Sequence, residues 1–348
     1  MKSQLFRAGL SALWYSGAAR TLARWTAGKG ALLMLHRVLP AAPPGFAPNA
    51  RLAVTPEYLA SLLASFRDAN IDILSLDAAL ARIAQRDPCR RFVCFTFDDG
   101  YRDNLEHALP VFQRFDAPFT VFATTGFADR SLAPWWQALE LVLVERDQLR
   151  WPEGGQVASF DARDPAAKQG VFDLLSARFL DLTAAKLRAQ LSAFVAANGH
   201  SMRELAARDM CSWSELRALQ SAGVEIGCHC VSHPRLALET TRAVREQLLH
   251  ARHRLEAKLG RPVRHLAYPY GRAEHVGQRE FFIARELGFA SAVTTRQALI
   301  YQAHAQHLHA LPRIEVTPSF AESPHYLQTI LTGVPLVARN RGHLFVTT

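Results

Sequence analysis

The stretch Phe92–Gly100 reads Phe-Val-Cys-Phe-Thr-Phe-Asp-Asp-Gly. Its first six residues are almost without polarity, which is typical of a parallel strand buried on both faces. Asp98 and Asp99 follow at the carboxyl end of this strand. Neighbouring side chains point in different directions there, so the two carboxylates can take different roles. Because Asp-Asp-Gly is also good turn chemistry, the rest of the chain must decide between a turn and a functional site.

Short apolar strands and helical segments alternate on both sides of this stretch. Strands are predicted at residues 31–38, 71–76, 92–97, 119–123, 224–228, 263–268, 290–294 and 309–313. Helices are predicted between them, at residues 55–66, 77–86, 101–115, 212–223, 238–259 and 278–287. Parallel strands need such crossovers, so we expect an α/β protein whose sheet closes into a deformed barrel of roughly seven or eight β/α units.

Further segments flank or interrupt this pattern. Residues 1–30 are assigned to an N-terminal amphipathic helix, residues 31–320 to the barrel and residues 321–348 to a C-terminal tail. A mostly helical insertion is expected at about residues 127–210. It contains Trp135 and Trp136, which are interpreted either as core residues or as a platform on which a sugar ring stacks.

The first 27 residues are predicted to form one helix, with apolar side chains at near-helical spacing and Lys2, Arg7, Arg20 and Arg24 between them. Packing of this helix against the domain is the favoured interpretation. A signal peptide is an alternative, although polar residues interrupt the apolar centre and a clear cleavage site is missing. The other alternative is a peripheral contact with a membrane surface.

The bulk composition restricts the class of protein. The chain has 348 residues, 49% of them hydrophobic, and a formal charge of +9, so a large core and a basic surface are expected. The charge suits either a solvated surface or attraction to an anionic ligand, and no nucleic-acid motif accompanies it. Five cysteines without a regular framework indicate reduced thiols, and no apolar run is long enough to span a membrane. We expect a cytoplasmic protein, at the inner membrane surface if the N-terminal helix binds there.

His229 and His233 are four residues apart, which places both imidazoles on one side of a helical turn. With one aspartate they would form a three-ligand site for a divalent ion, open to water and substrate. Cys228 and Cys230 flank His229 and suggest a Cys/His zinc site instead. Side-chain alternation argues against that alternative, because it turns both thiols away from His229.

Chemistry-bearing residues recur just after strands, where a barrel builds its active site on one face. They are His36, Asp98, Asp99, His229, His233, Pro269-Tyr270-Gly271 and Arg313.

Three of these segments resemble, in order, motifs of the polysaccharide deacetylases, the NodB-homology proteins of carbohydrate esterase family 4. The segments are Thr96–Gly100, His229–Pro234 and Tyr268–Gly271. The resemblance covers about residues 31–313. It implies a NodB-type deformed barrel that holds a divalent metal, usually Zn²⁺, and removes N-acetyl groups from amino sugars by hydrolysis.

The resemblance also implies roles for single residues. Asp98 would be the general base. Tyr270 would line the acetyl pocket between Pro269 and Gly271, and its backbone N–H would help to hold the oxyanion. The metal ligands would be Asp99, His229 and His233.

The sequence departs from the family pattern in two of its motifs. Cys230 stands where Ser or Thr is usual, and a thiol is a weak hydrogen-bond donor. The arginine that usually precedes the Tyr268-Pro269 pair, and that orients the base, is missing. Arg313, at the end of another predicted strand, could reach across to Asp98 in its place.

The family's C-terminal histidine motif, which supplies the general acid, is absent after Arg313. Residues 33–38, Leu-Met-Leu-His-Arg-Val, look like that motif moved to the N-terminus, an order similar to that of the poly-N-acetylglucosamine deacetylases. The first and last strands of a closed barrel are neighbours, so this move would preserve the geometry of the site. His36 is therefore predicted to be the acid, with a packed strand histidine as the alternative.

The predicted function is metal-dependent hydrolysis of N-acetyl groups from an amino-sugar polysaccharide or chitooligosaccharide, with release of acetate. The reaction class is hydrolysis of linear amides outside peptide bonds, and the expected partner is an N-acetylated glycan. Two alternatives stay open. One is a deacylase of a lipid-linked sugar or a non-sugar amide, and the other is a carbohydrate-binding protein that has lost catalysis.

Overall fold

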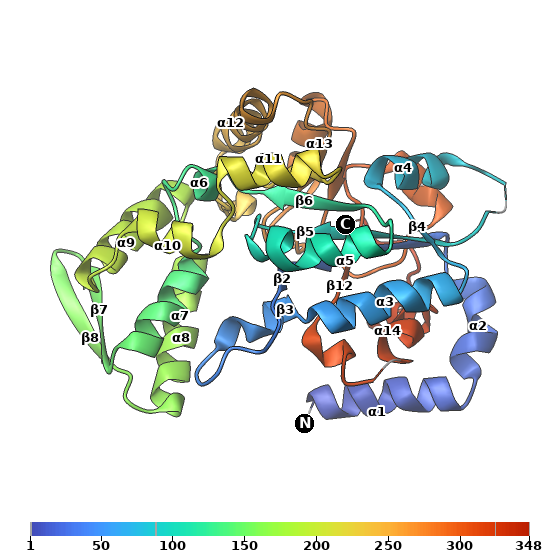
Figure 1. The fold of residues 1–348 in the computed structure, drawn as a ribbon, viewed down its shortest axis with the longest axis horizontal. Helices are drawn as coiled ribbons and strands as arrows, with labels where there is room; N and C mark the ends of the chain where they lie inside the picture. Colours follow the sequence, from blue (N-terminus) through green and yellow to red (C-terminus); the bar gives the residue numbers. More distant parts are fainter. Residues whose placement is uncertain (1, 88, 324, 348) are drawn as a thin grey trace.

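The computed structural model describes residues 2–87, 89–323 and 325–347. Its centre is an eight-stranded parallel sheet in the order β11-β10-β9-β6-β5-β1-β12, with β4 beside β5 (Figure 1). The strands are β1 (Gly30–Leu35), β4 (Asp72–Ile73), β5 (Phe92–Phe97), β6 (Phe119–Ala123), β9 (Glu225–Cys228), β10 (His265–Ala267), β11 (Ser291–Val293) and β12 (Ile314–Glu315). The sheet curls into a deformed, incompletely closed barrel, so the predicted fold class is confirmed.

The chain around Arg313 brings the two edges of the sheet together. Leu311 pairs with Val293 of β11 in a single parallel bridge, and Ile314 pairs with Leu33 of β1. The first and last strands are therefore neighbours, as predicted. The predicted strand at residues 309–313 is wrong in position, because the regular pairing begins only after Arg313. Pro312 has no N–H to donate to a strand ladder, which accounts for this late start.

Alternation along β5 separates two apolar layers. Val93, Phe95 and Phe97 point outward to the helices, where Phe95 meets Phe66 and Phe112 edge to face. The even-numbered residues face the barrel interior, and the next inward position after the strand is Asp98. The hydrophobic pattern that buries the strand therefore also directs the first carboxylate into the barrel.

Helices cover the outside of the sheet (Figure 1). They are α3 (Pro56–Asp68), α5 (Leu109–Arg114), α6 (Thr125–Ala128), α11 (Trp213–Ser221), α12 (Thr241–Leu259) and α13 (Gln278–Glu286). Helix α4 (Leu76–Ala84) instead packs against the interior-facing layer that includes Phe92 and Cys94. Side chains cap the starts of several of these helices. Thr55 caps α3, and a capping box between Ser212 and Glu215 opens α11. One turn of π-helix, Asn104–Ala108, precedes α5.

The segment between β6 and β9 forms a separate lobe at the edge of the barrel (Figure 1). Its helices are α7 (Trp135–Glu145), α8 (Pro165–Leu180), α9 (Ala184–Ala197) and α10 (Met202–Asp209). Its core includes Trp151, Phe179 and Phe194. An antiparallel hairpin of β7 (Gln148–Glu153) and β8 (Gln156–Asp161) joins these helices and was not predicted. A second small pair, β2 (Arg37–Val38) and β3 (Ala53–Val54), extends from the end of β1.

The prediction of one N-terminal helix is wrong. The described residues form α1 (Lys2–Tyr15) and α2 (Ala18–Thr26), separated at Gly17, whose φ of 72° lies in the left-handed region; Met1 lies outside the described residues. A residue in this conformation ends the helical hydrogen-bond pattern, and glycine adopts it without steric cost. The C-terminal α14 (His325–Ile330) packs on α1, and α15 (Val334–Arg339) packs on α2.

All five cysteines are free, and four of them are buried. Within residues 2–87, 89–323 and 325–347, no helix has the length and apolarity needed to cross a bilayer.

Candidate active site

The ends of β1, β5, β9 and β10 surround one cavity of about 310 Å³. The structure brings together there most of the residues predicted from the sequence: His36, Asp98, Asp99, His229, His233 and Tyr270. Arg313 lies beneath the cavity, fully buried, in contact with Asp98. Pro269 and Gly271 shape the turn that carries Tyr270 and are not part of the cavity wall.

Strand alternation explains why His229 enters the cavity and its cysteine neighbours do not. Cys228 and Cys230 point outward into the layer under the helices, where both are fully buried. Position 227, which faces inward like His229, is a glycine. A Cβ on Gly227 would lie 2.4 Å from the ring of Phe122, so only glycine fits this part of the barrel interior. The argument that the thiols are packing residues is therefore confirmed.

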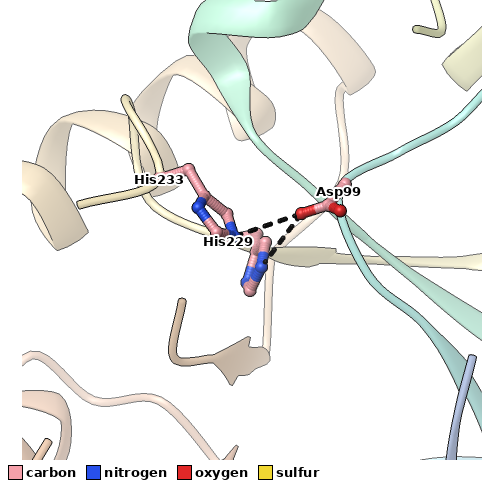
Figure 2. Close-up of side chains that lie close together, drawn as sticks. All are labelled: Asp99, His229 and His233. Atoms are coloured by element: carbon pink, nitrogen blue, oxygen red, sulfur yellow. Dashed lines mark ion pairs between the residues drawn. The ribbon is translucent and has the colours of Figure 1, made fainter. Parts of the chain in front are cut away.

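Asp99, His229 and His233 form a compact group of ligand atoms (Figure 2). The Nε2 atoms of His229 and His233 lie 3.4 and 3.2 Å from the same oxygen of Asp99. Nδ1 of His229 donates to the carbonyl oxygen of Ala267 at 2.7 Å, since a carbonyl can only accept. This bond fixes the tautomer and leaves the lone pair of Nε2 directed at the group, as in metal sites whose histidines are held by an outer partner.

The group fits a divalent metal ion. The Oδ1 atom of Asp99 is buried and makes no hydrogen bond of good geometry with any described residue, although two imidazoles approach it. Burial alone would raise the pKa of Asp99, but the two histidines hold it well below its usual range. Burial lowers the pKa of His233, whereas Asp99 and Asp98 raise the pKa of His229 in spite of its burial. An ionised carboxylate and a neutral imidazole are the forms that bind metals.

Asp98 is held in a different way from its neighbour. Arg313 donates two hydrogen bonds to the two carboxylate oxygens, at 2.7 and 2.6 Å, and a third to Thr96 at 3.0 Å. Burial would raise the pKa of Asp98, but the charges of Arg313 and His229 keep it below its usual range. Asp98 is thus oriented, ionised and outside the Asp99 group.

Strained backbone is concentrated in the segments that form the cavity. Asp99, Cys230, His233 and Tyr270 have φ values of 76°, 64°, 52° and 61°. Side chains other than glycine rarely occupy this region, which costs on the order of 1–3 kcal/mol per residue. Such strain persists where the surrounding structure fixes the chain, and here it turns the metal-ligand candidates and Tyr270 toward one another.

The lobe between β6 and β9 contributes an aromatic wall to the cavity. Trp135 donates from its indole N–H to the hydroxyl of Tyr270 at 3.0 Å, and Trp136 donates to the hydroxyl of Tyr101 at 2.8 Å. Both indoles are over 90% buried. They are core residues of the lobe that also line the cavity, and neither presents a free ring face on the surface.

His36 lines the cavity directly after β1, beside the end of β5. Its backbone carbonyl accepts from the amide of Asn104 at 2.9 Å. Asp103 holds the next two residues by accepting from the Arg37 side chain at 2.8 Å and from the backbone N–H of Val38 at 2.9 Å. The imidazole itself is half-buried and makes no hydrogen bond with the described part of the chain. The strand end is therefore fixed while the ring remains available.

Several residues of the cavity wall were not predicted. Arg51 and Arg272 stand at its exposed side, and Glu315 pairs in register with Met34 and faces inward beside it. The lobe adds further apolar side chains, Phe172 and Leu180. None belongs to a motif, and only the three-dimensional fold brings them near the site.

Solved structures with a similar fold support this architecture. The deacetylase PplD of Streptococcus pyogenes, in complex with acetate, is 18% identical with a TM-score of 0.58, over 86% of this chain and 97% of that chain. IcaB from Ammonifex degensii is 19% identical with a TM-score of 0.55, over 88% and 98%. The polysaccharide deacetylase BC0361 of Bacillus cereus is 16% identical with a TM-score of 0.54, over 87% and 69%. At identities this low, the structural similarity establishes a common fold and nothing further.

The sequence itself gives the family. No curated protein matches the chain. A family model described as polysaccharide deacetylase matches residues 85–291, which is more than half of the chain and includes Asp98, Asp99, His229, His233 and Tyr270. The chain therefore belongs to the polysaccharide deacetylase family.

Proposed function

We propose that the protein hydrolyses N-acetyl groups of an amino-sugar polysaccharide or oligosaccharide and releases acetate, with Zn²⁺ as the expected ion. The observation that carries this proposal is the contrast between the two adjacent carboxylates. Asp99 lies among imidazoles that suit a metal, whereas Asp98 is clamped by Arg313 in the same cavity. The acetate in the structure of the Streptococcus pyogenes deacetylase is consistent with an acetyl product.

The first step requires a base next to the reacting water. Asp98 has this role in the proposal, because its lowered pKa keeps it ionised at neutral pH and Arg313 holds its orientation. Asp99, His229 and His233 would hold the divalent ion. Such an ion lowers the pKa of water and polarises the carbonyl oxygen of an amide.

The second step requires an acid within reach of the departing amine. His36, which lines the same cavity at the end of β1, would protonate the departing sugar amine. The backbone N–H of Tyr270, which donates to no other described residue, would stabilise negative charge on the amide oxygen. Asp98 and His36, which follow the adjacent strands β5 and β1, thus divide the proton transfers in one cavity.

A lipid-linked amino sugar is the second candidate substrate. The observation that favours it is the apolar part of the cavity wall, formed by Leu52, Phe172 and Leu180. These side chains suit an apolar group beside the amide better than a fully hydrated glycan. A glycan remains the first candidate substrate, because a sugar also suits the aromatic wall of the cavity and the proposed hydrolysis of an amide.

Acetate release from N-acetylglucosamine oligomers, with the metal content measured on the same sample, tests the proposal. We expect one bound divalent ion per chain and activity that a chelator abolishes and Zn²⁺ restores. The matched variant is Asp98→Asn, which should retain the ion and lose activity. Oligomer binding without acetate release would instead favour a carbohydrate-binding protein. Activity that survives both chelation and Asp98→Asn would contradict the mechanism.

A further inference from the structure

The junction of α1 and α2 exposes apolar and basic side chains side by side. Tyr15 is 77% exposed, Leu22 39% and Trp25 59%. Arg20 and Arg24 are exposed as well, and the guanidinium of Arg24 lies 3.7 Å from the centre of the Trp25 ring. We call these five side chains the corner surface.

Helix α2 buries its small side chains and exposes its large ones. Ala19 is fully buried and Ala23 half-buried, whereas Leu22 and Trp25 face water. Burial of a leucine side chain contributes about 1.5–3 kcal/mol, so packing against the domain would favour the reverse arrangement. The prediction that this helix packs on the domain therefore holds for its alanine face only, and the fold does not account for the exposed leucine and tryptophan.

The corner surface is held firmly against the barrel. At the end of α2, the hydroxyl of Thr26 donates to the carbonyl of Thr332 at 2.6 Å, and the carbonyl of Thr26 accepts from the hydroxyl of Tyr301 at 2.6 Å. Helix α15 packs along α2 from the other side. The large side chains are consequently displayed in a fixed arrangement.

The N-terminal region that contains the corner surface carries positive charges and no negative ones. The first 56 residues contain seven lysines and arginines and no aspartate or glutamate, so they carry +7 of the chain's formal charge of +9. Neither Arg20 nor Arg24 has an ion-pair partner among the residues that the structure describes. Free cations beside an exposed tryptophan and leucine are the composition of helices that lie in the interface of anionic membranes.

We propose that the corner surface docks the protein on the anionic surface of a lipid bilayer. Leu22 and Trp25 enter the headgroup region, and Arg20 and Arg24 pair with lipid phosphates. Helix α2 leads into the amino end of β1, whereas the cavity is built at the carboxyl ends of the strands. The bilayer therefore contacts the end of the sheet remote from the cavity and leaves the cavity free.

Co-sedimentation of the full chain with vesicles tests the electrostatic part of the proposal. We expect binding to vesicles of phosphatidylcholine with phosphatidylglycerol, weak binding to phosphatidylcholine alone, and a loss of binding at high salt. Arg20→Gln and Arg24→Gln should each weaken the affinity roughly fivefold. Equal binding to both kinds of vesicle, or affinity unchanged in the double variant, would overturn the proposal.

Quenching of tryptophan fluorescence by brominated lipids tests the apolar part. Quenching by anionic vesicles should largely disappear in Trp25→Phe, and Leu22→Gln should weaken vesicle binding as an independent variant. The matched control is Phe282→Ala with Arg285→Gln on α13. Phe282 is 51% exposed, and the guanidinium of Arg285 lies 5.9 Å from the centre of its ring. Helix α13, which carries both residues, lies on the opposite edge of the molecule from α1 (Figure 1).

The control variant should bind vesicles like the unaltered protein, and thermal unfolding should confirm that each variant is folded. An equal loss in the control would mean that any exposed aromatic side chain with an arginine suffices, which would contradict docking through the corner surface. A dimer in lipid-free solution that Trp25→Phe dissociates would assign the surface to a second copy of the chain and also overturn the proposal. Acetate release from a soluble oligomer should not change in any of these variants, so this test is separate from that of the proposed function.

Discussion

Arg313 and Asp98 form a buried ion pair across the barrel, although they lie 215 residues apart in the sequence. Their side chains are 0% and 4% exposed, and two parallel hydrogen bonds join them. Besides the hydrogen bond to Thr96, Nε of Arg313 donates to the carbonyl oxygen of Thr294 at 2.9 Å, which further fixes the guanidinium. Arg313 thus makes the contact with Asp98 that was expected of it in place of the arginine missing before Tyr268.

Removal of Arg313 should destabilise the protein more than removal of both partners. In Arg313→Met, Asp98 would remain buried without a countercharge, and breaking a buried pair in this way costs about 3–5 kcal/mol. The double variant Asp98→Asn with Arg313→Met should recover part of this loss. Urea unfolding of the four proteins in the cycle measures the coupling free energy, and additive effects of the two changes would show that the pair is not energetically coupled.

Metal binding should depend on His229 and not on the cysteine that follows it. His229→Ala removes one of three ligand candidates, so we expect the bound metal to fall to a small fraction of one equivalent. Cys230→Ser is the matched control, because its side chain points to the opposite side of the chain. Metal analysis after dialysis gives the result. Loss of metal in Cys230→Ser with a folded protein would assign the thiol to the metal site.

His36 should matter only when the leaving group needs a proton. An amine leaves as a neutral molecule after protonation, so His36→Ala should lower kcat on an N-acetylglucosamine oligomer by about 100-fold or more. The leaving group of p-nitrophenyl acetate departs without a proton, and its hydrolysis should be reduced far less. Asp98→Asn should impair both reactions. An equal loss on both substrates in His36→Ala would indicate a structural role for this histidine.

The sequence was sufficient to predict which strand ends meet, because a physical rule connects them. Parallel strands place their carboxyl ends on one face, and alternation fixes which side chains enter the barrel. The inward directions of Asp98 and His229 follow from these rules. The contact of Arg313 with Asp98 was expected only as a replacement for the arginine missing before Tyr268, because no strand rule fixes it and regular pairing of β12 begins after Arg313.

The features that were not predicted depend on the local conformation of the backbone or on contacts between residues far apart in the sequence. Gly17 interrupts an otherwise helical pattern, and periodicity alone cannot tell a tolerated glycine from a break. Gly154-Gly155 between two short polar-apolar segments was a hairpin signal that the helical character of the lobe obscured. The positions of Phe172, Leu180 and Glu315 on the cavity wall carried no signal, because tertiary packing alone brings them there.

A buried histidine outside the cavity should make the stability of the protein depend on pH. His304 is fully buried near Phe345, and its Nδ1 accepts from the backbone N–H of Tyr301 at 3.0 Å. Burial lowers the pKa of His304 to about 4, and the nearby His307 adds to this effect. An unfolded chain would protonate the same side chain at a pKa of about 6.5.

At pH values between these two pKa values, His304 is mostly protonated in the unfolded state and mostly neutral in the folded state. Acidification therefore favours unfolding. Stability from this group is complete at pH 7 and is lost as the pH falls from about 6.5 toward 4. Between pH 7 and pH 5 the loss should be about 2 kcal/mol. Urea unfolding of the unaltered protein and of His304→Gln at both pH values isolates this contribution from other titrating groups. The pH-dependent loss should be smaller in His304→Gln by about that amount, and equal losses in the two proteins would show that His304 is protonated as readily in the fold as in the unfolded chain.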